Sequence, residues 1–237
     1  MKRIYAAVLT VLAALAATSA PARAALRVPQ IPFTVSALQT RFNNLGESIN
    51  VATQQQDGLV WGATVSGNSV FTIQFDLGPV NPGNNGDAEL GIAKLDATGH
   101  SVTGLAAVFP SWADNGFFAV ASFLPPDGLV VHLFGPAANP MGSMTYTGVN
   151  RSLFGYYIKS GGNTFYSHDG FNSDSKVHAL AFAGTGQNTG CWWQCWEESP
   201  IANYVDADYN DAVVFMESVN PTPVAKTTWS MLKARFR

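Results

Sequence analysis

Four oxygen-bearing side chains crowd into six residues near the C-terminal end of the chain. The segment DADYND, residues 206–211, contains Asp206, Asp208, Asn210 and Asp211, and the apolar run AVVFM follows it directly. Carboxylates this close together repel one another unless water or a cation separates their charges. Calcium binds six to eight oxygen ligands, which carboxylates, amide carbonyls and backbone carbonyls supply. The spacing therefore predicts a calcium site, and the alternative is a solvated acidic turn before a strand.

Two further segments carry oxygen ligands. The first, YSHDGFNSDSKVHALAF (166–182), contains two aspartates in a turn, and the second, WEESP (196–200), contains two glutamates. His178 is interpreted as a core histidine and His168 as a turn residue, in preference to ligands. The predicted metal ligands are Asp169, Asp174, Glu197, Glu198, Asp206, Asp208, Asn210 and Asp211.

The acidic segment also approaches the ligand spacing of an EF-hand. Counted from Asp206, positions 1, 3, 5 and 12 are acids or amides, but position 6 is Asp211, where that loop requires glycine. Residues 212–216 are apolar and partly β-branched, which favours a strand. In a strand, Glu217 would lie about 20 Å beyond Asp211 at roughly 3.3 Å per residue, out of reach of a shared ion. We therefore reject an EF-hand.

No catalytic signature occurs in the sequence. The motifs G-x-S-x-G, H-E-x-x-H, G-x-x-x-x-G-K-[ST] and G-x-G-x-x-G are all absent. Glu197 and Asp208 would suffice as the paired carboxylates of a glycosidase, but their spacing does not single them out. The sequence therefore predicts a non-enzymatic protein, with a polysaccharide-acting enzyme that uses these carboxylates, or a carbohydrate-binding module, as the alternative.

The segment CWWQCW, residues 191–196, combines both cysteines of the chain with three tryptophans. An even cysteine count in an exported chain favours a disulfide between Cys191 and Cys195, with reduced thiols as the alternative. Zinc is disfavoured, because one C-x3-C pair supplies two ligands and structural zinc sites use four. Core packing, a sugar-stacking platform and a protein contact all remain open for Trp192, Trp193 and Trp196.

Short strands separated by turn residues recur along the chain. The turns contain Gly, Asn, Asp and Pro, which supply positive or fixed φ angles. A short helix is expected near the N-terminus over 35–46, where Leu38, Phe42 and Leu45 have helical spacing. The pattern predicts an all-β fold, an antiparallel two-sheet β-sandwich that is jelly-roll-like. The expected strands are 69–77, 88–96, 102–109, 116–124, 128–135, 143–149, 153–160, 177–184 and 212–219.

The chain divides into three parts. Residues 1–24 contain Lys2 and Arg3, an apolar stretch and an A-x-A site, which is typical of a secretory signal peptide. Residues 25–219 form the predicted sandwich domain, and no later stretch is apolar enough to predict a membrane span. Residues 220–237 are expected to be a proline-containing linker and a short basic amphipathic helix. The protein is therefore expected to be secreted or held at the cell surface.

Charge is distributed unevenly between the domain and the tail. All sixteen acidic residues, but only six of the thirteen basic ones, lie within residues 25–225, which gives this part a net charge of about ten negative. The last twelve residues contain four basic residues and no acidic one. An acidic domain excludes nucleic acid as the expected partner and favours cations.

Three segments together carry a family resemblance. FYSHDGFNSDSKVHALAFAG, WWQCWEESP and DADYNDAVVFMES resemble the bacterial secreted family called domain of unknown function 4114. That family has D-x-D-[YF]-[ND]-D ahead of a final apolar strand, which Asp206 to Asp211 match, and it usually has Asp where Glu198 stands here. The match is good over 153–218 and weaker over 60–150, and the cysteines lie in a segment that is not a family feature.

The resemblance implies an all-β exported protein that binds calcium in surface or matrix contexts, with no known activity. We therefore expect an exported, calcium-binding β-sandwich that works as a non-catalytic surface or extracellular-matrix binding or structural module. Its expected partners are calcium and, in addition, glycans or cell-surface components.

Overall fold

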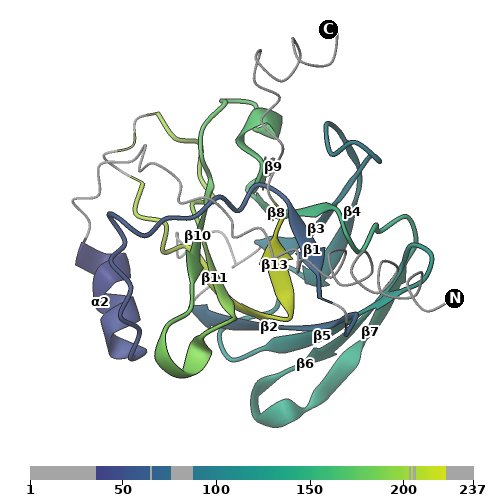
Figure 1. Ribbon diagram of the computed structural model, residues 1–237, viewed down its shortest axis with the longest axis horizontal. Coiled ribbons are helices and arrows are strands. Elements are labelled where there is room, and N and C mark those ends of the chain that lie inside the picture. The colour runs from purple at the N-terminus through teal and green to yellow at the C-terminus, as the bar shows by residue number, and fades with distance from the viewer. Residues whose placement is uncertain (1–35, 65, 76–87, 203, 205–206, 223–237) are drawn as a thin grey trace, which may run out of the picture.

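The computed structural model describes residues 36–222, apart from 65, 76–87, 203 and 205–206 (Figure 1). The predicted signal peptide, the predicted C-terminal helix and Asp206 lie outside the described residues.

Two antiparallel sheets face each other, which confirms the predicted all-β sandwich (Figure 1). The first, here called sheet A, has the order β10 (Ala179–Ala183), β11 (Trp192–Trp196), β12 (Ala212–Glu217), β2 (Asn68–Phe75), β5 (Phe118–Leu124), β6 (Gly128–Phe134) and β7 (Pro140–Tyr146). Sheet B has the order β13 (Val219–Pro221), β1 (Trp61–Ala63), β8 (Phe154–Ser160), β3 (Glu89–Leu95) and β4 (Val102–Phe109), and β9 (Asn163–Tyr166) also pairs with β8.

Strand alternation builds the core between the two sheets. In β5, Ala119, Ala121 and Phe123 are buried, and the intervening side chains are partly exposed on the outer face. Successive side chains of a strand point to opposite faces, so one set from each sheet meets in the middle. The largest fully buried side chains of this core include Trp61, Phe71, Phe154, Tyr156 and Trp196.

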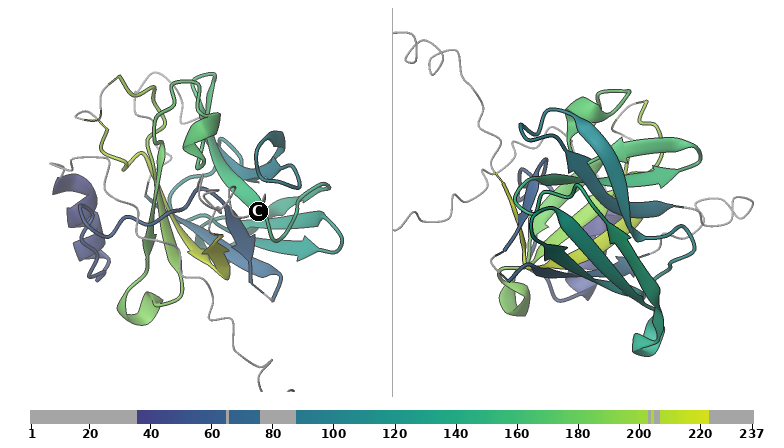
Figure 2. Two further views of the ribbon diagram at one scale, coloured as in Figure 1. Left: turned by 45° about the horizontal axis from the view of Figure 1, so that its top comes forward. Right: turned by 90° about the vertical axis from the view of Figure 1, so that its right-hand side faces the viewer.

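A second apolar cluster lies on the outer face of sheet A. Helix α2 (Ser36–Asn44) places Leu38 and Phe42, one helical turn apart, against β10 and β11 (Figures 1 and 2). The Phe42 ring meets Phe182 edge-on at 5.3 Å and Trp193 at 5.6 Å between ring centroids. This half of sheet A is therefore covered on both faces, which explains why all five residues of β11 are buried.

The sandwich continues beyond residue 219, where the sequence predicted a linker. Asn220 and Pro221 belong to β13, which pairs with β1. The Trp192 Nε1–H donates to Asn220 Oδ1 at 3.3 Å, and the Thr222 N–H donates to the Val60 carbonyl at 2.7 Å. The domain boundary therefore lies at or after Thr222.

Within the described part of the chain, the connections contain three short 3-10 helices: η1 (Pro136–Ala138), η2 (Asp169–Phe171) and η3 (Gly186–Asn188). Among the described residues, no helix is long and apolar enough to cross a membrane.

Candidate metal site

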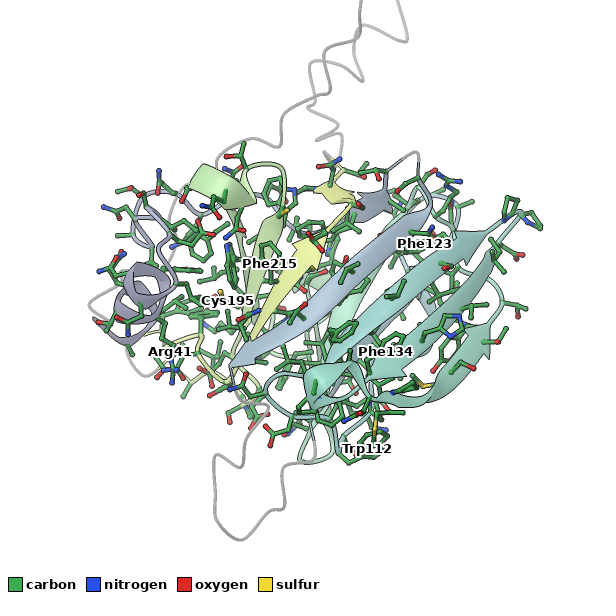
Figure 3. The ribbon with its side chains drawn as sticks, turned by 90° about the horizontal axis from the view of Figure 1, so that it is seen from below. Arg41, Trp112, Phe123, Phe134, Cys195 and Phe215 are labelled. Carbon is green, nitrogen blue, oxygen red and sulfur yellow. The ribbon has the colours of Figure 1, made fainter. Side chains whose placement is uncertain are left out.

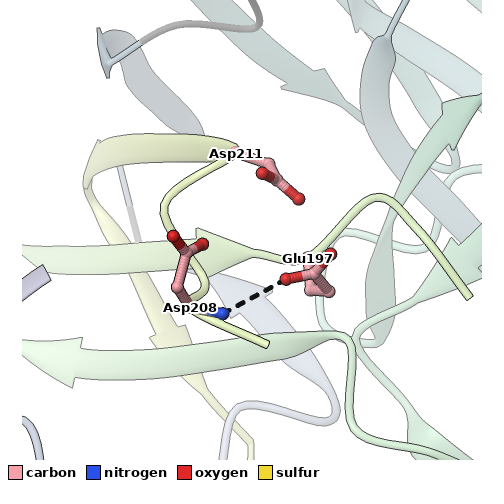
Figure 4. Close-up of side chains that lie close together, drawn as sticks. All are labelled: Glu197, Asp208 and Asp211. Carbon is pink, nitrogen blue, oxygen red and sulfur yellow. Dashed lines mark hydrogen bonds between the residues drawn. The ribbon is translucent and has the colours of Figure 1, made fainter. Parts of the chain in front are cut away.

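Glu197, Asp208 and Asp211 form a cluster, here called the carboxylate trio, at one end of sheet A (Figure 4). Trp196 and Ala212 are opposite one another where β11 ends and β12 begins, and the Asp211 N–H donates to the Trp196 carbonyl at 3.2 Å. The residue after β11 and the residue before β12 must therefore meet. One carboxylate oxygen from each member of the trio lies within 4.8 Å of the others.

The loop before β12 is held by Tyr209. This residue is fully buried in a left-handed conformation with φ of 54°, and its hydroxyl donates to the Val177 carbonyl at 2.6 Å. Ala207 is also buried, whereas Asp208 and Asn210 are partly exposed. Residues 207 and 209 thus point inward, and Asp208 lies beside Glu197.

Backbone donors orient the carboxylates. The Asp208 N–H donates to Glu197 Oε2 at 3.3 Å, and the Glu198 N–H donates to Asp211 Oδ2 at 2.9 Å. The Asn210 N–H lies 3.3 Å from Asp208 Oδ1. These contacts fix the side chains without neutralising them, because a backbone N–H carries no net charge.

Burial and like charge act together on the trio. Burial raises the pKa of Glu197 well above its ordinary range, and the charges of Asp211 and Asp208 raise it further. Burial also raises the pKa of Asp211, and a side-chain hydrogen bond joins Asp211 to Glu197. Burial and the charge of Asp211 raise the pKa of Glu198. Among the described residues, no Lys, Arg or His forms an ion pair with the trio.

The donor set fits a hard divalent cation. All three side chains present oxygen, which suits calcium or magnesium better than the softer, sulfur- and nitrogen-preferring metals. A cation would relieve the repulsion between the carboxylates and would link the ends of β11 and β12.

Asp174, a predicted ligand, belongs to a different group. Its Oδ2 lies 3.0 Å from His178 Nε2 and also accepts from the Ile201 N–H at 3.4 Å, while Oδ1 accepts from the Lys176 N–H at 3.0 Å. Burial alone would raise the pKa of Asp174, but these hydrogen bonds and the His178 charge lower it below its ordinary value. Asp174 therefore stabilises a turn.

The other predicted ligands lie beside the trio or apart from it. Glu198 adjoins the trio and makes a side-chain hydrogen bond with Ser160. Asp169 begins η2 and does not join the group. The structure thus brings together three of the predicted ligands, with Glu198 and Asn210 next to them. The anchoring role of Tyr209 was not predicted, because a left-handed tyrosine leaves no signal in the sequence.

The three tryptophans are buried, with 9%, 2% and 0% exposure for Trp192, Trp193 and Trp196. Trp192 meets Trp61 edge-on between the sheets at 5.6 Å, and Trp193 faces the second cluster under α2. The core interpretation therefore holds, and these residues form no exposed sugar-stacking platform.

The predicted disulfide is not present. Cys191 and Cys195 are free, and Cys195 is buried in β11. Four residues of extended chain span about 13 Å, whereas a disulfide joins Cα atoms about 4.4–6.8 Å apart. The strand conformation of 192–196 thus keeps the two thiols apart.

Comparisons of the chain with protein-family models, curated proteins and solved structures find no match. The family resemblance seen in the sequence therefore stays a prediction.

Proposed function

We propose that this protein is an exported, calcium-binding β-sandwich that acts as a non-catalytic surface or extracellular-matrix binding or structural module. The observation that carries the proposal is the convergence of Glu197, Asp208 and Asp211 within 4.8 Å, where no described cationic side chain compensates their charge. Three carboxylates in a partly buried position destabilise a fold unless protons or a cation neutralise them.

Two features favour binding over catalysis at this site. Glu197 is only 9% exposed, and one of its oxygens already accepts the Asp208 N–H. A glycosidase needs both carboxyl groups free to reach a sugar ring between them. A buried, hydrogen-bonded carboxylate is better suited to holding an ion that joins β11 to β12.

Thermal unfolding in calcium and in chelator tests the proposal. Calcium at 100 times its Kd should stabilise the fold by about 2.7 kcal/mol, which corresponds to a rise of several degrees in Tm. Asp208→Asn should abolish the calcium-dependent part of the shift. The matched control is Asp127→Asn, because Asp127 is exposed in the turn between β5 and β6, outside the trio.

Identical melting curves for the wild-type protein in excess calcium and in chelator would contradict the proposal. An equal loss of the calcium shift in both variants would show that the effect arises from the overall negative charge and not from the trio.

A further inference from the structure

A pocket of about 150 Å³ lies on the outer face of sheet A, apart from the carboxylate trio. It lies where the end of α2 and the η3 turn meet β12 and β2, and Figure 3 shows Phe215 on this face. Its lining residues are Leu45, Gln74, Asn188, Trp193 and Phe215.

We propose that this pocket binds a single neutral sugar unit, with Phe215 against the apolar side of the ring and the amides of Gln74 and Asn188 on its hydroxyl groups. The proposal uses no carboxylate of the trio and does not depend on calcium binding.

The aromatic wall of the pocket is rigid. Trp193 and Phe215 are cross-strand partners of β11 and β12, and their ring centroids lie 4.8 Å apart. The Trp193 Nε1–H donates to Glu47 Oε1 at 2.8 Å, and Phe42 packs against the indole from α2. A wall that is already fixed loses little conformational entropy when a ligand packs on it.

The polar groups of the pocket are amides with unused hydrogen-bonding capacity. Among the described residues, the half-buried Gln74 side chain has no hydrogen-bond partner. The Asn188 Nδ2–H donates to Glu47 Oε1 at 2.7 Å, and this fixes the amide orientation because a carboxylate only accepts. The Asn188 Oδ1 is therefore presented as an acceptor, and Gln74 offers both donors and an acceptor.

Charge and size select the class of ligand. No lining residue is charged, and the nearby Glu47 carboxylate is already satisfied by Thr185, Asn188 and Trp193. The acidic domain disfavours anions, and a purely aliphatic ligand would leave the two amides desolvated without partners. The pocket is smaller than the roughly 300–1,000 Å³ of sites for drug-sized ligands, so one ring fits better than an extended molecule.

Trp112 is the competing site for a sugar. Its side chain is 55% exposed and meets Phe117 edge-on at 5.9 Å, which makes it the most exposed large aromatic group among the described residues. Figure 3 shows Trp112 well away from Phe215, so substitutions at the two places can be interpreted separately.

Binding of the full chain to immobilised neutral hexose oligosaccharides tests the proposal. Polygalacturonate serves as the acidic probe, and binding to every probe is measured once in calcium and once in chelator. The variants are Gln74→Leu, Trp112→Ala and the control Thr72→Val, which lies two residues from Gln74 on the same face of β2 outside the pocket. We expect the wild-type protein to bind at least one neutral oligosaccharide in both buffers. Gln74→Leu should weaken that binding about two- to tenfold. Thr72→Val and Trp112→Ala should leave it unchanged.

Three results would overturn the proposal: no binding to any neutral oligosaccharide, loss of binding with Trp112→Ala but not with Gln74→Leu, or retention only on polygalacturonate in calcium. Unfolding temperatures measured on the same samples show that each variant is folded. They also report the calcium shift separately, so failure of the sugar site is distinguishable from failure of the calcium site.

Discussion

His178 joins two of the acid-rich segments. Its ring is fully buried and stacks on Phe165 with centroids 3.6 Å apart. One ring nitrogen lies 2.8 Å from the Glu197 carbonyl and the other 3.0 Å from Asp174 Oδ2. The two ring nitrogens thus each contact an oxygen, one of the backbone and one of a carboxylate. The histidine thereby holds the segment that contains Glu197 against the turn that contains Asp174.

The charge of Asp174 should make stability depend on pH in the acid range. The pKa of Asp174 is lower in the folded state than the ordinary value of 3.8. Its contribution to the free energy of unfolding is therefore complete above the ordinary pKa and is lost as pH falls through the folded pKa. Asp174→Asn should lower the free energy of unfolding near neutral pH by about 1–2 kcal/mol, because a charged hydrogen bond is replaced by a neutral one. Urea unfolding between pH 3 and 7 measures both effects.

In this experiment the offset between the Asp174→Asn and wild-type curves should shrink as pH falls below about 3.8, because Asp174 is then protonated first in the unfolded state and, at lower pH, in the folded state. Asp127→Asn provides the control, and its curve should run parallel to the wild-type one. A constant offset between wild type and Asp174→Asn down to pH 3 would show that Asp174 acts by shape alone.

At the scale of elements, the loop before β12 depends on one buried tyrosine. Tyr209→Phe keeps the ring in the second apolar cluster but removes the hydroxyl that donates to the Val177 carbonyl. An unpaired buried carbonyl costs about 1–3 kcal/mol, so we expect a loss of this size in the free energy of unfolding in chelator. Because Asp208 and Asp211 lie within two residues of Tyr209, the variant should also bind calcium more weakly in a calorimetric titration.

Strand β11 determines the state of both cysteines. Cys195 is buried with its pKa raised by burial, whereas Cys191 lies just before the strand and is partly exposed. A thiol reagent should therefore label one cysteine per native chain, at Cys191, and both cysteines after denaturation. Labelling is slow because burial also raises the Cys191 pKa and thiolate is the reactive form. Mass spectrometry that finds no reactive thiol in the denatured, unreduced protein would instead indicate a disulfide.

The strands that the sequence predicted are apolar or alternating runs bounded by clear turn residues, and they include strands such as β8 and β10 that are almost entirely buried. β5 and β6 alternate and are bounded by clear turns, so residues 116–124 and 128–135 were located to within two residues. β11 has no alternation because α2 covers its outer face, and the short strands β1 and β9 are too brief to leave a periodic signal. The disulfide prediction failed for the same reason, since nothing local shows that 192–196 is extended.

The site was predicted only in part because its members meet through the sheet. Spacing along the chain correctly placed Asp208 beside the start of a strand, but it could not show that Glu197 closes the cluster through the pairing of β11 with β12. Spacing likewise grouped Asp174 with the ligands, although its partner is the core residue His178. A hydrogen bond between a buried ring and an acid four residues away depends on the turn between them, which composition does not encode.

At the scale of the whole molecule, the sandwich extends at least to Thr222, whose N–H donates to the Val60 carbonyl. The two apolar clusters, one between the sheets and one under α2, are both built from residues 38–219. The basic segment 226–237 lies outside the described residues. The negative domain attracts a positive tail only weakly, because exposed charge pairs contribute about 0–1 kcal/mol each.

Deleting residues 226–237 should therefore leave Tm nearly unchanged. The deletion should instead alter how the protein is divided between the cells and the medium, which is measured by fractionation. The matched control is truncation after Val219, which removes the pairing of Pro221 with Trp61 and the Asn220 and Thr222 hydrogen bonds. Loss of about 1–2 kcal/mol should lower Tm by at least a few degrees in that control. If the shorter deletion melts as low as the control, then the predicted C-terminal helix packs on the sandwich and the tail is part of the fold. If both deletions melt like the full chain, β13 contributes no stability and the domain boundary lies at 219.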